Sequence, residues 1–226
     1  MMTMALDYLN RHGKTFSARL HRGIHPKHLV ATPGHDWYLQ YLKPTDRVLD
    51  LGAGNLVHTM RIARAVRQTE WMDTAYGDDI TQPLPYATHT FEVVVLLDVL
   101  EHLEPRQVVL AEIYRVLKPE GILLVTGPNR MSRWRRRLRA AGLFAFQDPD
   151  HKVEYTRGEF MAELELAGFH VEHVRPIVYD TPLAGLIDLV GGVSLRLYAT
   201  LSAWKARRAH RYPSETTGWT AVAWRV

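Results

Sequence analysis

The sequence has 226 residues, of which 46% are hydrophobic, and it carries a formal net charge of +4 at pH 7. This length suits one α/β domain with additions, so we expect a single domain over residues 1–226. The absence of cysteine excludes disulfides, thiolate metal sites and cysteine nucleophiles, and the absence of a long apolar run or a secretory pattern makes a cytoplasmic protein the default expectation.

Residues 1–43 mix a helical pattern with turn residues, which predicts an N-terminal helical cap. Four histidines lie here without tight i, i+4 pairing to carboxylates, so no metal site is predicted: His21, His25, His28 and His35. Residues 36–42 are amphipathic, and Lys43-Pro44 should end a helix before the first strand.

The segment Arg47–Asn55 reads as a buried strand that ends in a glycine turn. Val48, Leu49 and Leu51 are apolar, Gly52 and Gly54 remove two side chains, and helical spacing begins after them. A strand, a glycine turn and a helix are typical of the nucleotide-binding crevice of a doubly wound sheet. A tight turn in any parallel α/β domain is the alternative interpretation.

Residues 74–77 read as a second strand that ends at Asp78 and Asp79. In sites of this architecture, an acid about 20 positions beyond the glycine turn accepts the ribose hydroxyls. The gap is somewhat longer here. The most apolar strand candidate follows at 91–97, as expected at the centre of a parallel sheet, and ends at Asp98.

A helical pattern follows at 99–117, a strand at 122–126 and a break at 127–129. Later segments predict a helix at 157–167, a strand at 169–174, an amphipathic stretch at 183–211 interrupted by Gly191-Gly192, and a last strand at 219–226.

Arginines cluster on a predicted helix over residues 130–139: Arg130, Arg133, Arg135, Arg136, Arg137 and Arg139. Such a cluster can meet phosphate, an anionic membrane or an acidic substrate, and a solvated helix face is the alternative.

In order, these segments resemble the class I S-adenosylmethionine-dependent methyltransferases, in particular those acting on small molecules and lipids. The likeness covers about residues 40–178 and four stretches: the glycine turn at 48–54, the block FEVVVLLDVLEHL at 91–103, the block 114–129, and the late helix and strand at 154–169. Leu56 lies near the place where the family often has a third glycine.

The resemblance implies a doubly wound, mostly parallel, seven-stranded sheet (Rossmann-like) with an antiparallel C-terminal hairpin. It also implies a cofactor-binding core at 44–178 and an acceptor- or membrane-facing insertion with the last strand at 179–226. S-adenosylmethionine is the implied cofactor, with Asp50 ordering the turn and Asp79 holding the ribose, or Asp78 in its place. The implied cofactor residues are Asp50, Gly52, Ala53, Gly54, Asn55, Asp78, Asp79, Ile80, Leu97 and Asp98.

Methyl transfer depends on alignment and water exclusion, and a base helps if the acceptor is a hydroxyl. His151 is our first candidate for the base and His102 the second; a structural role is the alternative for both. Trp134, Leu138 and Trp204 with nearby cations suggest a peripheral membrane contact and an amphiphilic acceptor. An RNA methyltransferase and a catalytically silent subunit are the rival readings. The sequence does not give the oligomeric state.

Overall fold

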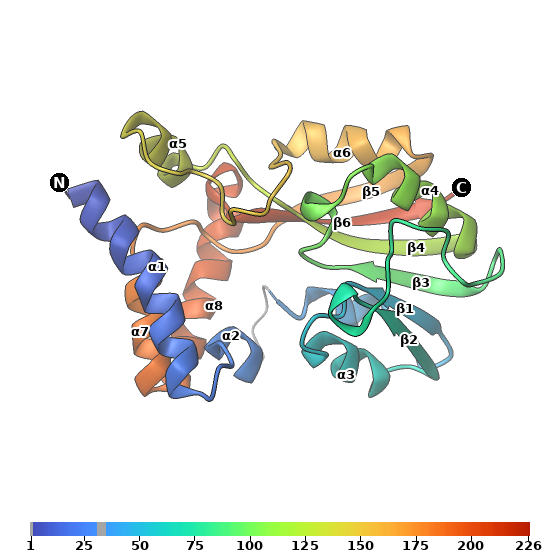
Figure 1. Ribbon diagram of the computed structural model, residues 1–226, viewed down its shortest axis with the longest axis horizontal. Helices are drawn as coiled ribbons and strands as arrows, with labels where there is room; N and C mark the ends of the chain where they lie inside the picture. Colours follow the sequence, from blue (N-terminus) through green and yellow to red (C-terminus); the bar gives the residue numbers. More distant parts are fainter. Residues whose placement is uncertain (1, 31–34) are drawn as a thin grey trace. The chain divides into compact units, whose positions relative to one another are not determined.

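The computed structural model describes residues 2–30 and 35–226 (Figure 1). Residues 31–34, which belong to the predicted cap, lie outside the described residues. The chain divides into two compact units, each built from three separate segments. The sheet unit contains 38–129, 148–175 and 219–226, and the helical unit contains 1–37, 130–147 and 176–218. The sequence predicts a single domain over residues 1–226 and does not indicate these two units.

The sheet unit is built on six strands in the order β2-β1-β3-β4-β6-β5. They are β1 (Arg47–Leu51), β2 (Gln68–Met72), β3 (Phe91–Leu96), β4 (Leu117–Pro128), β5 (Phe169–Pro176) and β6 (Gly218–Arg225). β1 pairs in parallel with β2 and β3, and β3 with β4. β5 and β6 form the predicted antiparallel C-terminal hairpin.

The strand count corrects the expectation of seven strands, because the described residues form six. The segment between β2 and β3 contains a short 3-10 helix, η2 (Thr74–Tyr76), followed by turns. The predicted strand over 74–77 is therefore wrong. The Asp73 carboxylate accepts a hydrogen bond from Ala75 N at 2.7 Å, and Gly77 ends the turn with φ 95°. An N-terminal cap of this kind favours a helical turn over extended backbone.

The core of the sheet unit follows from the apolar runs seen in the sequence. Val94, Val95 and Leu96 of β3 are completely buried, as are Val48 and Leu49 of β1. Strands buried on both faces are expected at the centre of a parallel sheet. The doubly wound prediction is confirmed in this respect, although β4 is longer than the strand predicted at 122–126.

The sheet unit also contains α3 (Val57–Ala63), α4 (Arg106–Val116) and α6 (Arg157–Leu166). α6 begins with a capping box, in which Thr156 Oγ1 accepts from Glu159 N and the Glu159 carboxylate accepts from Thr156 N. It packs tightly on β4, because a Cβ at Gly127 would lie 2.7 Å from Phe160 Cε2. The helix predicted at 36–42 is instead the 3-10 helix η1 (Trp37–Tyr41).

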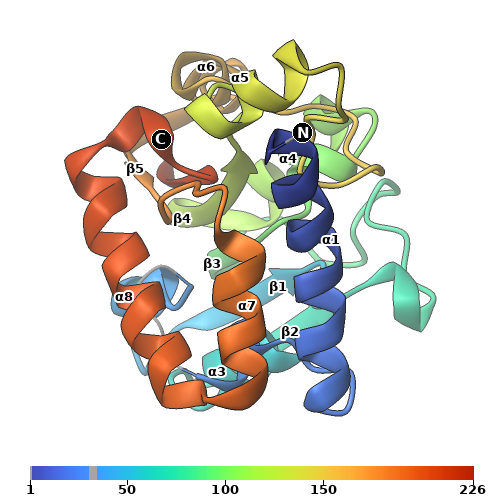
Figure 2. The same ribbon diagram turned by 90° about the vertical axis from the view of Figure 1, so that its left-hand side faces the viewer.

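The helical unit contains α1 (Met2–Leu20), α2 (Pro26–Leu29), α5 (Arg133–Ala140), α7 (Ala184–Val193), α8 (Leu195–Arg211) and the 3-10 helix η4 (Pro213–Glu215). α1 and α7 lie side by side (Figure 2). Their backbones meet at two glycines, since a Cβ at Gly13 would be 2.4 Å from Gly185 O and one at Gly185 would be 2.2 Å from Leu9 O.

The break between α7 and α8 lies at Ser194, beyond the predicted interruption at Gly191-Gly192. Ser194 has extended backbone, ends α7 and caps α8 by accepting from Leu197 N at 3.4 Å. Both glycines remain inside α7, where the missing side chains admit Tyr198 and Leu20. Among the described residues, no helix combines the length and apolar character required to cross a membrane.

Candidate functional site

The candidate site lies where the strand order of the sheet reverses. β1 runs between β2 and β3, and all three are parallel, so their carboxyl ends meet at one edge. In open α/β sheets, ligands bind at this switch point. Gly52 and Gly54 follow β1 with φ 80° and 53°, a backbone region that favours glycine. A Cβ at Gly52 would lie 2.1 Å from Val99 Cγ2, so the turn packs against the segment after β3.

Main-chain hydrogen bonds join the glycine turn to the end of β2. Gly52 N and Ala53 N both donate to Met72 O, at 2.8 and 3.3 Å, and Gly54 N donates to Asp73 Oδ2 at 2.7 Å. The exposed Asn55 accepts from Val57 N at 3.3 Å through its side chain. The turn is therefore held by the neighbouring strand before α3 begins.

Leu56, which lies near the place of the third glycine that the resemblance implies, has a backbone conformation that favours glycine. It is the N-cap of α3 and adopts a left-handed conformation with φ 62° and ψ 8°, without a side-chain cap. A side chain costs about 1 kcal/mol or more in this region, and glycine avoids that cost. The departure from the family pattern thus leaves the backbone path unchanged and places strain in it.

Asp50 lies under the turn and is 2% exposed. Thr59 Oγ1 donates to its Oδ2 at 2.5 Å, which joins β1 to α3. Burial raises the pKa of Asp50 to about 6, the Thr59 hydrogen bond opposes this rise, and the charge of Asp73 adds to it. The role of Asp50 in ordering the turn stays a prediction.

The acid at the carboxyl end of β2 is Asp73. It contacts the glycine turn directly and follows Gly54 by 19 positions. By contrast, Asp79 is exposed and accepts from Thr81 N and Oγ1 at 2.9 and 2.6 Å; these bonds lower its pKa. Asp78 accepts from Asp73 N at 3.1 Å, and Ile80 is buried.

Leu97 and Asp98 follow β3, at the same edge as the glycine turn. Asp98 has φ 57°, and its amide donates to Thr126 Oγ1 at 2.7 Å. The same hydroxyl donates to Asp98 Oδ1 at 3.1 Å, so β4 fixes both ends of this residue. Leu97 and Asp98 thus lie at the switch point, since the next residue, Val99, packs against Gly52 of the glycine turn.

The two predicted catalytic histidines lie together. Their ring centroids are 4.7 Å apart, in an edge-to-face arrangement. His102 ends the 3-10 helix η3 (Leu100–His102), and His151 precedes α6 in a loop whose Lys152 N donates to Glu101 O at 2.7 Å. His151 Nδ1 lies 3.0 Å from Glu154 Oε1. Glu154, three positions further along the chain, is therefore a carboxylate partner of His151.

Glu101 completes this group and is 3% exposed. Its Oε1 lies 3.8 Å from His151 Nε2, and its buried Oε2 has no hydrogen-bond partner among the residues that the structure describes. Burial raises the pKa of Glu101 well above its usual range, and the charges of Asp98, Glu154 and Asp148 raise it further. Glu101, His102 and His151 each offer a ligand atom, and these atoms lie within 4.8 Å of one another.

The sequence reading missed Asp73, Glu101 and Glu154. Asp73 has the expected spacing of about 20 positions from the glycine turn, but the predicted strand at 74–77 directs attention to Asp78 and Asp79 instead. Glu101 and Glu154 each neighbour a selected histidine, one position before His102 and three after His151. Only the fold brings the two histidines together.

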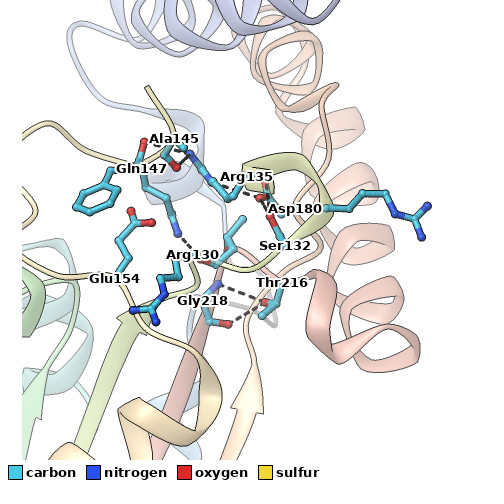
Figure 3. Close-up of polar contacts among 12 residues, drawn as sticks. Arg130, Ser132, Arg135, Ala145, Gln147, Glu154, Asp180, Thr216 and Gly218 are labelled. Atoms are coloured by element: carbon cyan, nitrogen blue, oxygen red, sulfur yellow. Dashed lines mark hydrogen bonds and ion pairs between the residues drawn. The ribbon is translucent and has the colours of Figure 1, made fainter. Parts of the chain in front are cut away.

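Two arginines of the cluster, Arg130 and Arg135, are partly buried, and Figure 3 shows the polar contacts around them. Arg135 lies 3.4 Å from the buried Asp180 and donates to Phe146 O at 3.2 Å; Ser132 Oγ also donates to Asp180. Four arginines on this helix remain exposed: Arg133, Arg136, Arg137 and Arg139.

The proposed apolar membrane anchors are corrected at two positions. Trp134 and Leu138 are 5% and 2% exposed and pack with Ala145 in the helical unit. They face inward because α5 uses its apolar stripe for its own packing. Trp204 is 40% exposed, with the Arg208 guanidinium 5.7 Å from its ring centroid.

Comparison with known proteins gives one family. The model of the methyltransferase domain matches residues 26–174. The chain is similar to a probable S-adenosylmethionine-dependent methyltransferase of Mycolicibacterium smegmatis, with 34% identity over 54% of this chain and 44% of that protein. It is 28% identical to a ubiquinone/menaquinone biosynthesis C-methyltransferase of Cereibacter sphaeroides, over 70% of this chain and 63% of that protein.

A third relative, the 27-O-demethylrifamycin SV methyltransferase of Amycolatopsis mediterranei, is 31% identical over 60% of this chain and 58% of its own length. The chain therefore spans between about two fifths and two thirds of these relatives. A solved methyltransferase structure from Aquifex aeolicus shares the fold, with TM-score 0.58, 14% identity, and coverage of 93% of this chain and 98% of that one.

Proposed function

The chain belongs to the family of class I S-adenosylmethionine-dependent methyltransferases, and on this basis we propose that it transfers a methyl group to a small or lipid-like acceptor, at an oxygen atom. The observation that carries the proposal is the switch-point edge of the sheet. There the glycine turn follows β1, Asp73 follows β2, and Glu101 and His102 come after β3, with His151 of the loop before α6 beside them, all in one unit.

The residues at this edge fit S-adenosylmethionine. We propose that the backbone at Gly52, Ala53, Gly54 and Asn55 lies against its amino-acid and ribose parts, above the buried Asp50. Asp73 would accept the ribose hydroxyls, since its carboxylate is fixed beside Gly54 N. This assignment replaces Asp79, because the carboxylate of Asp73 bonds to the glycine turn whereas that of Asp79 bonds to Thr81.

The adenine side of the cofactor fits the loop after η2. Asp78 and the buried Ile80 would contact the base there, and Leu97 and Asp98 would line the side that faces the acceptor. When bound, the cofactor supplies a methyl group: the acceptor's lone pair forms the new bond to carbon, while the carbon–sulfur bonding pair stays on sulfur.

We propose that His151 activates the acceptor, with His102 second. Glu154 accepts from His151 Nδ1–H, which leaves the Nε2 lone pair available. A hydroxyl acceptor gives up its proton as its oxygen attacks, and a side chain held in this way aids that step. The relatives named for ubiquinone/menaquinone biosynthesis and for 27-O-demethylrifamycin SV suggest an acceptor of the quinone or rifamycin kind. Oxygen is favoured because a histidine beside a carboxylate suits a hydroxyl proton.

A docking role for the exposed arginines accompanies this proposal. Four exposed arginines of α5 place cations at the surface: Arg133, Arg136, Arg137 and Arg139. The apolar residues Trp134 and Leu138 of the same helix are buried and do not contribute to this surface. An anionic lipid surface that carries the acceptor fits these charges, with electrostatics in place of apolar insertion. A salt-sensitive complex with RNA would instead favour the nucleic-acid rival.

Calorimetry with S-adenosylmethionine tests the cofactor site. Asp73→Asn should weaken binding at least about tenfold, because charge-assisted hydrogen bonds contribute about 1.5–3 kcal/mol. The matched control Asp79→Asn should change affinity less than about twofold. The reverse order would return the ribose to Asp79, and no binding by the wild-type chain would overturn the proposed function. Mass spectrometry of cell extracts incubated with labelled cofactor then identifies the acceptor.

A further inference from the structure

The Glu101–His102–His151 group is arranged in the manner of a metal centre. Its ligand atoms lie within 4.8 Å of one another and come from two segments, η3 and the loop before α6. Lys152 N donates to Glu101 O at 2.7 Å, so the main chain holds the two segments in register. A site formed by fixed backbone requires little rearrangement to receive an ion.

The separation between Glu101 and His151 fits a bridging cation. Glu101 Oε1 and His151 Nε2 are 3.8 Å apart, which is too long for a hydrogen bond. Two ligands bound to one ion at about 2.1 Å are roughly 3–4 Å apart. The observed distance therefore leaves room for an ion between the two atoms.

Burial of Glu101 supplies an independent observation. The side chain is 3% exposed, and its Oε2 is buried with no hydrogen-bond partner. A buried polar atom without a partner costs free energy, and a buried carboxylate is stabilised when it coordinates a metal. Nearby acids, among them Asp98 and Glu154, make the surroundings more favourable for a cation.

Glu154 completes the arrangement as a positioning residue. Its Oε1 lies 3.0 Å from His151 Nδ1, on the ring side opposite the proposed ion. Metal-binding histidines usually donate their second ring nitrogen to a carboxylate in this way, which fixes the tautomer and strengthens the ligand.

From these contacts we propose that Glu101, His102 and His151 bind one divalent transition-metal cation, such as Zn²⁺, Mn²⁺ or Co²⁺. Two imidazoles and one carboxylate favour these ions over Mg²⁺ and Ca²⁺, which prefer oxygen ligands. Three protein ligands leave coordination positions for the acceptor, and His102 is only partly covered.

The proposal deepens the proposed function, on which its catalytic part rests. A cation here binds the acceptor oxygen and lowers the pKa of its hydroxyl, whose proton passes to water before the oxygen attacks the methyl carbon. With the ion bound, His151 and His102 would serve as its ligands, and this role would replace the role as base proposed for them above.

Cobalt binding tests the site without requiring turnover. Protein stripped with a chelator is titrated with Co²⁺, followed by calorimetry and visible absorption. One equivalent should bind, and Glu101→Gln and His151→Gln should each weaken binding at least tenfold and alter the absorption bands. The exposed residues Glu165 and His170 provide matched controls, because Glu165→Gln and His170→Gln should bind as the wild type does.

Absence of Co²⁺ binding by the wild-type chain, or equal binding by all four variants, overturns the metal site. His102→Asn, at a partly exposed position, serves as the test if the buried variants do not fold. Calorimetry with S-adenosylmethionine separates the two proposals. Cation binding without cofactor binding leaves the site and overturns the function, whereas the opposite result overturns the site alone.

Discussion

Asp50 is a buried carboxyl group at the base of the candidate cofactor turn. Burial raises its pKa to about 6 in the folded chain, above the usual value near 4. The folded state therefore binds this proton more tightly than the unfolded state does. Between about pH 4 and pH 6, this group makes the free energy of unfolding decrease as the pH rises.

Asp50→Asn should remove this dependence. The variant keeps an oxygen that accepts from Thr59 and carries no charge. The free energy of unfolding of the variant, minus that of the wild type, should increase by on the order of 2–3 kcal/mol from pH 4 to pH 7, since one pKa unit corresponds to about 1.4 kcal/mol. Urea unfolding at both pH values measures the change. A constant difference between the two proteins would contradict the raised pKa.

At the scale of elements, the crossing of α1 and α7 depends on two small residues. Gly13 and Gly185 allow the backbones to meet, and a Cβ at Gly13 would be 2.4 Å from the carbonyl oxygen of Gly185. Asn10 Oδ1 also accepts from Gly185 N at 2.7 Å. Backbone atoms cannot move aside as a flexible side chain can, so the crossing has little tolerance for added volume.

Gly13→Ala should destabilise the protein by roughly 1–3 kcal/mol, because overpacking forces the helices apart. Gly158 of α6 is the matched control, since it is also helical and a Cβ there meets nothing within 4 Å. Gly158→Ala should be neutral or stabilising by up to about 1 kcal/mol. Thermal and urea unfolding measure both variants. Equal stability of the two would show that the close crossing carries no packing constraint.

At the scale of the whole molecule, the formal net charge of +4 conceals an uneven distribution. Exposed arginines concentrate on α5, and they should bind anionic lipid vesicles in a manner that weakens with added salt. Arg133→Glu/Arg137→Glu should reduce vesicle binding several-fold in sedimentation assays. The pair Arg64→Glu/Arg67→Glu changes the net charge equally at exposed positions elsewhere and should have little effect. An equal loss from both pairs would indicate that net charge alone governs binding.

The sequence by itself determined the buried strands β1 and β3, the glycine turn and the family resemblance, but it placed the second strand at 74–77 instead of at β2. The strand at 91–97 can be predicted from its long apolar run, because a strand buried on both faces must be apolar throughout. The turn at Gly52 and Gly54 can be predicted in the same way, because residues other than glycine rarely adopt its backbone conformation. These are local requirements, so local sequence expresses them.

The tertiary structure decided which acids belong to the candidate site. Asp73 lies beside Gly54 because β1 and β2 are adjacent. The sequence instead predicts Asp79 as the acid of the site, because it places a strand at 74–77. Glu101 and His151 meet because the loop before α6 returns to η3, 50 positions later in the sequence. The tertiary structure also buries Trp134, which the sequence predicts to contact a membrane. Contacts between distant segments depend on chain packing, which no local pattern encodes.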